Sequence, residues 1–190
     1  MPLSAQIQTG AKASSVWNQR PNADEHSVAH NAYIKQVPAG DLFATLGRQA
    51  GELTALFSQL PDEKWRYRYA EGKWSVLEVL GHLVDGERIQ CFRAMHVARG
   101  DQNPLPGFEE NDYMRESHFE EYQTGESLLD QFRHLRSAHL GMLQGLPPET
   151  LLRRSMVNHV SLTTRAAVWV LTGHTQHHMN ILRERYGLKG

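Results

Sequence analysis

Apolar residues recur at three- and four-residue intervals along four long stretches of the chain, and this periodicity constrains the fold more than any other feature. The stretches cover residues 41–60, 75–99, 126–144 and 163–186. In a helix such spacing places the apolar side chains on one face, which has to be buried against neighbouring helices. None of the stretches shows a convincing strand pattern. The sequence therefore predicts an all-α fold, a four-helix bundle.

Capping and helix-breaking residues mark the ends of these helices. Ser75 and Glu78 have the spacing of a capping box, so the second helix should start at Ser75, and Gly100 is placed to close it. Residues 101–124 then contain two prolines and a glycine among acidic and aromatic residues, which favours a long irregular connection. We therefore expect a long crossover connection between the second and third long helices, and a helical turn near residues 149–153.

The composition is typical of one globular domain with an arm. The 190 residues carry 20 Lys+Arg against 21 Asp+Glu, so the chain lacks the basic charge expected of a nucleic-acid-binding protein. Residues 1–32 are polar without a sustained period, and we expect an irregular N-terminal arm there, followed by a bundle domain over residues 33–190. We expect no signal peptide and no membrane span, because the arm has no unbroken apolar run. A single cysteine, Cys91, allows no internal disulfide and favours a cytoplasmic protein.

Histidine is the unusual component of the sequence, with eleven residues. His174 and His178 lie four residues apart, so both rings are on one face of the last helix and within reach of one ion. They share a stripe with Leu171 and Leu182 and should point into the bundle. His82 lies on the inward stripe of the second helix. Three histidines with a free fourth position make the catalytic type of zinc site, in which a bound water becomes acidic.

The spacing leaves other interpretations open. A single inward histidine is more often a hydrogen-bonded core residue than a ligand, and pairs four residues apart also arise by chance in a histidine-rich chain. His177 competes with His178 as the partner of His174, although its ring should lie nearer the flank of the helix. His96 lies nearly on the face of His82. The histidines outside the proposed site and its flank are expected to lie in solvent, two of them in the arm: His26, His30, His96, His118, His134, His139 and His159.

Three motifs follow one another along the chain: residues 73–83 with Asp85 and Glu87, Leu-Pro-Gly-Phe at 105–108, and Gly-His-Thr-Gln-His-His at 173–178. In this order they resemble the DinB/YfiT-like superfamily of metal-binding four-helix bundles, over roughly residues 33 to 187. The resemblance implies that His82, His174 and His178 bind a divalent ion. It implies zinc or nickel first, with iron or manganese as alternatives, and a homodimer.

A three-histidine ion with an open position can act as a Lewis acid, or can lower the pKa of a bound water or thiol. The resemblance therefore implies one of two activities on a small-molecule substrate: metal-dependent hydrolysis, or transfer of a low-molecular-weight thiol to an electrophile. The alternative is a non-catalytic protein, either a metal-binding bundle or a dimeric structural or interaction module. The sequence leaves the substrate and the physiological metal open.

Two acidic residues near His82 are assigned roles as hypotheses. Asp85 lies one turn from His82, and its carboxylate is placed to orient the free ring nitrogen of His82. A solvent-exposed Asp85 without that role is the equal alternative. Glu87 points further round the helix and is expected to pair with an arginine such as Arg88 or Arg93.

Residues outside the helical stripes add further expectations. Trp74 should pack as a cap over the end of the bundle rather than contact substrate. Phe108, Asp112 and Tyr113 lie in the long connection, and we expect this loop to cover the open coordination position and to select the substrate. Cys91 falls on the opposite side of its helix from the predicted ligand, and we expect a small core residue rather than a nucleophile.

Overall fold

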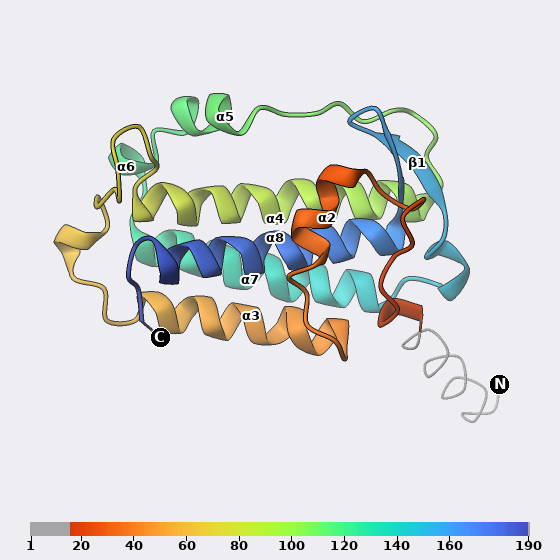
Figure 1. Ribbon diagram of the computed structural model, residues 1–190, viewed down its shortest axis with the longest axis horizontal. Helices are drawn as coiled ribbons and strands as arrows, with labels where there is room; N and C mark the ends of the chain where they lie inside the picture. Colours follow the sequence, from red (N-terminus) through yellow and green to blue (C-terminus); the bar gives the residue numbers. More distant parts are fainter. Residues whose placement is uncertain (1–15, 190) are drawn as a thin grey trace.

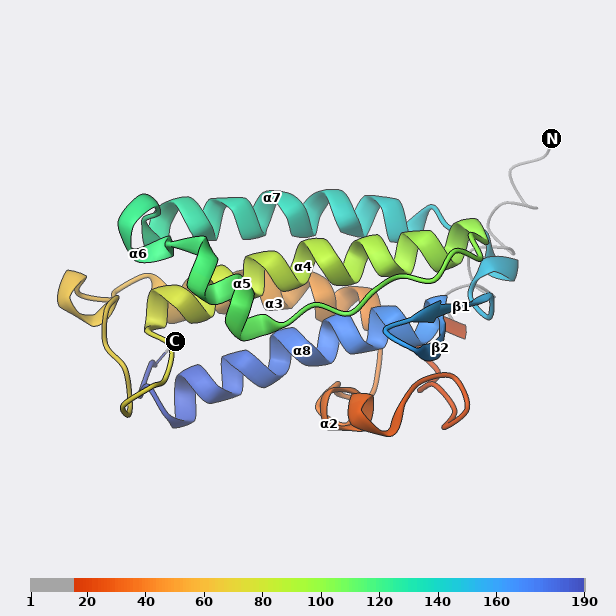
Figure 2. The same cartoon turned by 90° about the horizontal axis from the view of Figure 1, so that it is seen from above.

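Four long helices run side by side in the computed structural model, which describes residues 16–189 (Figures 1 and 2). They are α3 (Leu42–Phe57), α4 (Val76–Arg99), α7 (Gly125–Gln144) and α8 (Thr164–Glu184). α3 and α4 each pack against both α7 and α8. α4 and α7 run in the same direction, so the chain between them has to return along the bundle, as Figure 1 shows. The structure thus confirms the predicted four-helix bundle and its long crossover.

The helix ends are closed by the residues that the sequence indicates. Ser75 caps α4: its Oγ accepts a hydrogen bond from the backbone N of Glu78 at 3.2 Å, and the Glu78 carboxylate accepts one from the backbone N of Ser75 at 2.7 Å. Gly100 follows α4 with a left-handed backbone (φ 78°), which other residues adopt only with strain. Thr163 caps α8 through its hydroxyl. The caps thus fix the ends of α4 and α8, the two helices that carry the candidate ligand histidines.

Two clusters of buried apolar side chains form the core. One surrounds the C-terminal part of α4 and the N-terminal part of α8, and the other surrounds the opposite parts of the same two helices. Between the clusters lies a layer of buried polar side chains contributed by all four long helices: Gln49, Glu87, Arg136, Thr172 and Thr175. The middle of the bundle is therefore polar.

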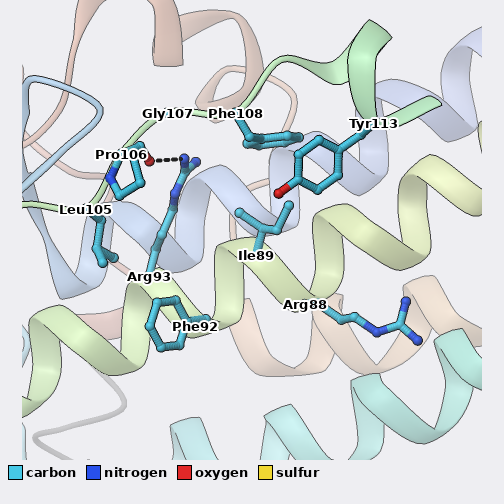
Figure 3. Close-up of a pocket in the computed structure, with 9 residues that line it drawn as sticks. All are labelled: Arg88, Ile89, Phe92, Arg93, Leu105, Pro106, Gly107, Phe108 and Tyr113. Carbon is cyan, nitrogen blue, oxygen red and sulfur yellow. Dashed lines mark hydrogen bonds between the residues drawn. The ribbon is translucent and has the colours of Figure 1, made fainter. Parts of the chain in front are cut away.

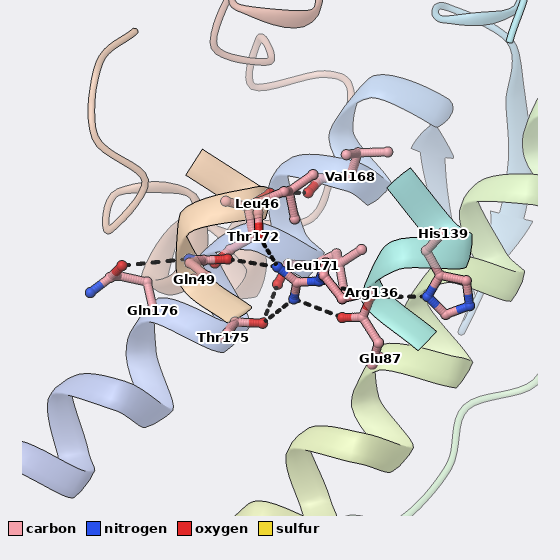
Figure 4. A network of polar contacts seen from close by, with 10 residues as sticks. All are labelled: Leu46, Gln49, Glu87, Arg136, His139, Val168, Leu171, Thr172, Thr175 and Gln176. Carbon is pink, nitrogen blue, oxygen red and sulfur yellow. Dashed lines mark hydrogen bonds and ion pairs between the residues drawn. The ribbon is translucent and has the colours of Figure 1, made fainter. Parts of the chain in front are cut away.

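Arg136 is the centre of this polar layer (Figure 4). Its Nε and Nη2 atoms donate to the two carboxylate oxygens of Glu87, at 3.0 and 2.7 Å. The Leu46 carbonyl, Gln49 Oε1 and Thr175 Oγ1 accept its remaining hydrogen bonds, at 2.9 to 3.1 Å. All five N–H groups of the buried guanidinium are thus paired, which offsets the cost of removing its charge from water.

Glu87 forms its ion pair with Arg136. The prediction that its partner is Arg88 or Arg93 is wrong. Its carboxylate is buried and points across the bundle to α7, where His139 Nδ1 also lies 2.9 Å from Oε1. Burial alone would raise the pKa of Glu87. The charge of Arg136 and the hydrogen bond with His139 outweigh burial and lower the pKa, so the carboxylate is ionised.

The crossover is helical in two places, although the sequence predicts an irregular connection. α5 (Glu110–Ser117) and α6 (Phe119–Tyr122) both pack on α4. The ring of Phe119 occupies the space left by Gly81 of α4, where a Cβ would clash with it. Helices of eight and four residues are too short to produce a clear apolar period in the sequence.

A two-stranded antiparallel hairpin precedes α8, where the sequence shows no convincing strand. β1 (Arg154–Val157) pairs with β2 (Val160–Thr163), and the turn residues Asn158 and His159 both have positive φ. Leu105 of the crossover bridges to the last residue of β1. The strands have only four residues each, so alternation gives little signal. The hairpin holds the start of the crossover in place.

The N-terminal segment from residue 16 to residue 37 lies beside α8 (Figure 2). It is mostly irregular and includes η1 (Val28–His30) and α2 (Asn31–Ile34). Residues 1–15 of the predicted arm lie outside the described residues, and the domain boundary at residue 33 stays a prediction.

Buried contacts hold this N-terminal segment on α8. Trp17 is 2% exposed, and its carbonyl accepts a hydrogen bond from the indole N–H of Trp169 at 2.8 Å. Glu25 forms a buried ion pair with Arg165 of α8. The segment from residue 16 onward therefore packs as part of the bundle.

Two short turns complete the chain, η2 (Asp62–Lys64) and η3 (Pro148–Thr150). The second is the helical turn predicted near residues 149–153. Within residues 16–189, none of the helices combines the length and the apolar character needed to cross a membrane.

Candidate metal centre

Three histidine side chains from two helices meet inside the bundle. His82 comes from α4, and His174 and His178 come from successive turns of α8. Their ligand nitrogens all lie within 4.8 Å of one another, and the Nε2 atoms of His82 and His174 are 2.9 Å apart. The three side chains are buried, at 3%, 5% and 8% exposure. The structure thus brings together the three histidines that the sequence singles out.

Burial keeps all three rings of this histidine cluster neutral. It lowers the pKa of His82 to about 4, with a smaller contribution from the charge of His177. Burial, followed by the neighbouring rings, also lowers the pKa values of His174 and His178 well below their usual range. A neutral imidazole has a lone pair for a metal, and an imidazolium has none. The cluster therefore offers three lone pairs at neutral pH.

Two glycines make room for the cluster. A Cβ on Gly86 of α4 would lie 2.7 Å from Cε1 of His174, so the ring fits because this position has no side chain. A Cβ on Gly173 would clash with the backbone of Tyr33 in α2. The Tyr33 ring meets His174 and His177 edge-on, with its centroid 5.5 Å from each. The N-terminal segment therefore closes one side of the cluster.

A pocket of about 260 Å³ opens at His178, and we call it the cluster pocket. Trp74 lines it and packs on the cluster, with its ring centroid 4.8 Å from that of His82. Glu110 of α5 is exposed at its mouth, where partial burial and the charge of Glu109 raise the pKa of Glu110. The cluster pocket gives a small molecule access to one edge of the cluster.

The donor set fits a divalent metal ion. Imidazole nitrogens suit zinc, nickel and iron. In a tetrahedral site with metal–nitrogen distances of about 2.05 Å, the ligand nitrogens are about 3.3 Å apart. The separations in the cluster, from 2.9 Å to at most 4.8 Å, lie on both sides of that value. Within residues 16–189 the cluster has no fourth protein ligand, as in catalytic zinc sites that keep a position for water or substrate.

Comparisons with known proteins agree with this architecture. The family model of the DinB superfamily matches residues 45–182, which is most of the chain. The chain belongs to the DinB superfamily. No curated protein matches the sequence significantly.

The DinB fold also appears in a solved structure similar to this chain, YfiT from Bacillus subtilis. The two superimpose with a TM-score of 0.67 at 17% sequence identity, over 90% of this chain and 95% of YfiT. YfiT is described as a probable metal-dependent hydrolase with an unusual four-helix bundle topology. At this level of identity the likeness shows the fold alone.

In this DinB-superfamily chain, Asp85 does not contact the cluster. Its Oδ1 lies 3.2 Å from Nη1 of Arg88, and among the described residues no hydrogen bond joins it to His82. Burial raises the pKa of Asp85, and Arg88 opposes that shift. The orienting role of Asp85 therefore stays a prediction without a supporting contact. His177 lies on the flank as expected, with Nδ1 2.9 Å from Gln36 Nε2.

Three histidines that the sequence places in solvent are held by the protein instead. His26 is 8% exposed, and its Nδ1 lies 2.8 Å from the Ser27 carbonyl. His96 is 7% exposed, and its Nε2 lies 2.9 Å from the Asn103 carbonyl. His139 is half-buried in the polar layer. Their burial depends on the N-terminal segment, the crossover and a facing helix, which helical spacing does not reveal. His30 is also partly buried, with its Nδ1 shielded from solvent, contrary to the expectation. The remaining three are exposed as predicted: His118, His134 and His159.

The crossover reaches the cluster pocket with residues other than those expected. Phe108 and Tyr113 line a different pocket, and Asp112 forms an exposed ion pair. Glu110 and Asn111 line the cluster pocket instead. The helical start of α5 explains the division, because neighbouring residues of a helix point in different directions.

Sequence reasoning missed Tyr33 as a neighbour of the cluster and Glu110 as a residue of the cluster pocket, and it placed Trp74 only as a cap. Tyr33 stands at the border of the predicted arm, and Glu110 is one of several acidic residues in the predicted loop. Tertiary packing of α2 and α5 alone brings the two residues to these positions, so the local sequence carries no signal for them.

Proposed function

We propose that this protein is a divalent-metal-dependent enzyme that acts on a small electrophile at His82, His174 and His178. The observation that carries the proposal is the opening of the cluster pocket at His178. Structural zinc sites are normally enclosed by four protein ligands. A site of three neutral imidazoles beside a cavity is the arrangement that admits a reacting molecule.

The three imidazoles would hold zinc or nickel, with iron or manganese as alternatives. When bound there, such an ion supplies the acidity that brings the pKa of a coordinated water or thiol toward neutrality.

The residues around the cluster pocket would bind the substrate and exchange protons with it. Trp74 provides an aromatic wall beside His82. Tyr33 covers His174 and excludes water on that side. Glu110, with its raised pKa, is the carboxylate placed to accept a proton at the pocket mouth.

Hydrolysis is the reaction that we place first, supported by the description of YfiT, which shares the fold. A water gives a proton to the carboxylate, its oxygen bonds to the electrophilic carbon, and the leaving group departs with a proton. Transfer of a low-molecular-weight thiol is the second candidate, because the same pocket and ligands would serve a thiol in place of water. The sulfur–carbon bond then replaces the bond to the leaving group.

Metal analysis and an activity panel test the proposal. Purified protein and the His82→Ala, His174→Ala and His177→Ala variants would be loaded with zinc or nickel and analysed by elemental mass spectrometry. We expect the first two to lose the ion and to keep their helical circular dichroism, and His177→Ala to keep both. Loaded protein would then be assayed with esters, amides and several cellular thiols with electrophiles.

Each outcome points to one class of protein. Ester or amide cleavage that disappears in His174→Ala supports hydrolysis, and thiol consumption that disappears supports transfer. Metal binding without any turnover, or unfolding on loss of the ion, would favour the non-catalytic bundle. The expected homodimer and cytoplasmic location stay predictions; light scattering of the purified protein measures the first.

A further inference from the structure

A second pocket lies between α4 and the crossover, and we call it the crossover pocket (Figure 3). Its volume is about 320 Å³, within the range of small-molecule sites. Its walls are mostly apolar or aromatic, and among the residues that line it are Ile89, Phe92, Leu105, Phe108 and Tyr113. No aspartate or glutamate lines it. This cavity would favour a compact apolar molecule.

Arg93 brings a buried positive charge into these apolar walls. The residue is 8% exposed, and the Phe108 ring lies over its guanidinium at 5.4 Å. Among residues 16–189 its hydrogen bonding is limited to one contact, from Nη2 to the Pro106 carbonyl at 3.3 Å. No carboxylate of the described chain lies within ion-pair distance of it. Four of its five donors therefore have no protein acceptor there.

The other two buried arginines of the described chain each have a carboxylate partner. Arg136 is paired with Glu87, and Arg165 is paired with Glu25. A buried charge is usually paired with an opposite charge, and Arg93 is the exception among these three arginines. Its unpaired nitrogens are not fully buried, so a molecule in the pocket can reach them. Burial lowers the pKa of Arg93, in agreement with a charge that lacks compensation.

The groups near Arg93 in the described chain supply no negative charge to balance it. His30 of η1 is partly buried, and its Nδ1 has no hydrogen-bond partner in the described chain. Burial, followed by the charges of His26 and Arg93, lowers the pKa of His30 to about 4. Tyr113 turns its hydroxyl into the pocket (Figure 3). An anion at this place would meet a guanidinium and a hydroxyl donor.

We propose that the crossover pocket binds a small monocarboxylate with an apolar body, whose carboxylate pairs with Arg93. Arginine matches a carboxylate with two parallel hydrogen bonds, and the apolar walls match the remainder of the molecule. Arg93 follows His82 by 93 − 82 = 11 residues, about 16 Å along α4, and the two pockets share no lining residue. The proposal is therefore independent of the metal chemistry.

Arg88 offers a matched control on the same pocket. Its guanidinium is already bound to Asp85 and to Gln131 of α7, at 3.2 and 2.8 Å. Figure 3 shows it directed away from Arg93. It can lose its charge without changing the carboxylate site.

The test is a titration of ¹⁵N-labelled protein followed by NMR, with 3-phenylpropionate and its neutral amide, 3-phenylpropanamide, as probes. EDTA is present throughout, so that the carboxylate cannot bind a metal at the histidine cluster. Wild type, Arg93→Met and Arg88→Met are compared. We expect the acid to bind about tenfold or more tightly than the amide, with shifts at Ile89, Phe92 and Gly107. Arg93→Met should lose that preference and Arg88→Met should keep it.

Three results would overturn the proposal: equal binding of acid and amide, shifts gathered at His178 instead of Ile89, or an unchanged preference in Arg93→Met. The comparison of acid with amide uses unaltered protein, so it decides the question even if Arg93→Met does not fold. None of these results bears on the proposed metal centre, because they are obtained without metal.

Discussion

Gly86 on α4 faces the ring of His174 on α8 so closely that a Cβ would stand 2.7 Å from Cε1. Because that distance is shorter than any ordinary carbon contact, either the ring or the helix would have to move. The absence of one side chain on α4 thus sets the position of a ring on α8, which points to a direct test of the cluster geometry.

Gly86→Ala should weaken metal binding by about 10- to 100-fold, the usual cost of disturbing residues that orient metal ligands. Gly47→Ala is the control, because Gly47 lies in α3 with open space around it. That change should stabilise the fold by about 0.5–1 kcal/mol and leave metal affinity unchanged. Affinities are measured by competition with a chromophoric chelator. Wild-type affinity in Gly86→Ala would show that the ring position does not matter.

Metal-free protein should lose stability as the pH falls from 6.5 to 4. The pKa of His82 drops from 6.5 to about 4 on folding, so between these values the unfolded chain binds a proton that the folded chain does not. Stability is therefore complete above pH 6.5 and declines below it, by about 2 kcal/mol at pH 5 for His82 alone. His174 and His178 shift in the same direction.

Urea unfolding at pH 7.5 and pH 5 measures this loss. His82→Gln cannot take up the proton and should lose less stability between the two pH values. Equal losses in the variant and the wild type would contradict the assigned role of burial.

Arg136→Met should destabilise the fold by about 3–5 kcal/mol, because it leaves the Glu87 carboxylate buried without its partner. The double variant Glu87→Gln with Arg136→Met should recover a large part of that loss. Arg133→Met, on the exposed side of α7, should change stability by less than about 1 kcal/mol. Chemical denaturation gives all three values. A double variant as unstable as the single one would argue that packing of Arg136, and not its charge, is what matters.

Glu110→Gln should lower the turnover of the metal-loaded enzyme by about 100-fold and leave its metal content unchanged. Since the pKa of Glu110 is raised above its usual 4.5, the acid limb of the wild-type pH profile should lie above that value and vanish in the variant. Glu116→Gln provides the control at an exposed position of the same helix outside the cluster pocket. If both variants behave alike, Glu110 carries no proton in the reaction.

Cys91 should be chemically inert in the folded protein. It is 1% exposed, and burial together with the charge of Glu87 raises the pKa of its thiol to about 12. Reaction with a disulfide reagent should therefore be at least about 100-fold slower in native protein than in urea. Comparable rates would mean that α4 opens readily, which its packing on α7 and α8 opposes.

The sequence predicts those parts of the molecule whose signal is local. The capping box at Ser75 and Glu78, the apolar period of the long helices and the four-residue spacing of His174 and His178 all depend on near neighbours in the chain. Each of these features is found in the structure. Short elements such as α5 and the hairpin escaped detection, because four to eight residues hold too little periodicity.

What the sequence by itself determined is the bundle and the inward direction of three histidines, since helical geometry converts spacing into a face. Only the tertiary structure decided which groups surround them. Tyr33 of α2 packs on the cluster, Glu110 of the crossover lines the cluster pocket, and Glu87 pairs with Arg136 across the bundle. Packing likewise leaves Arg93 without a carboxylate partner in the described chain. Contacts between groups far apart in the chain depend on how the helices pack, and the local spacing of residues does not predict them.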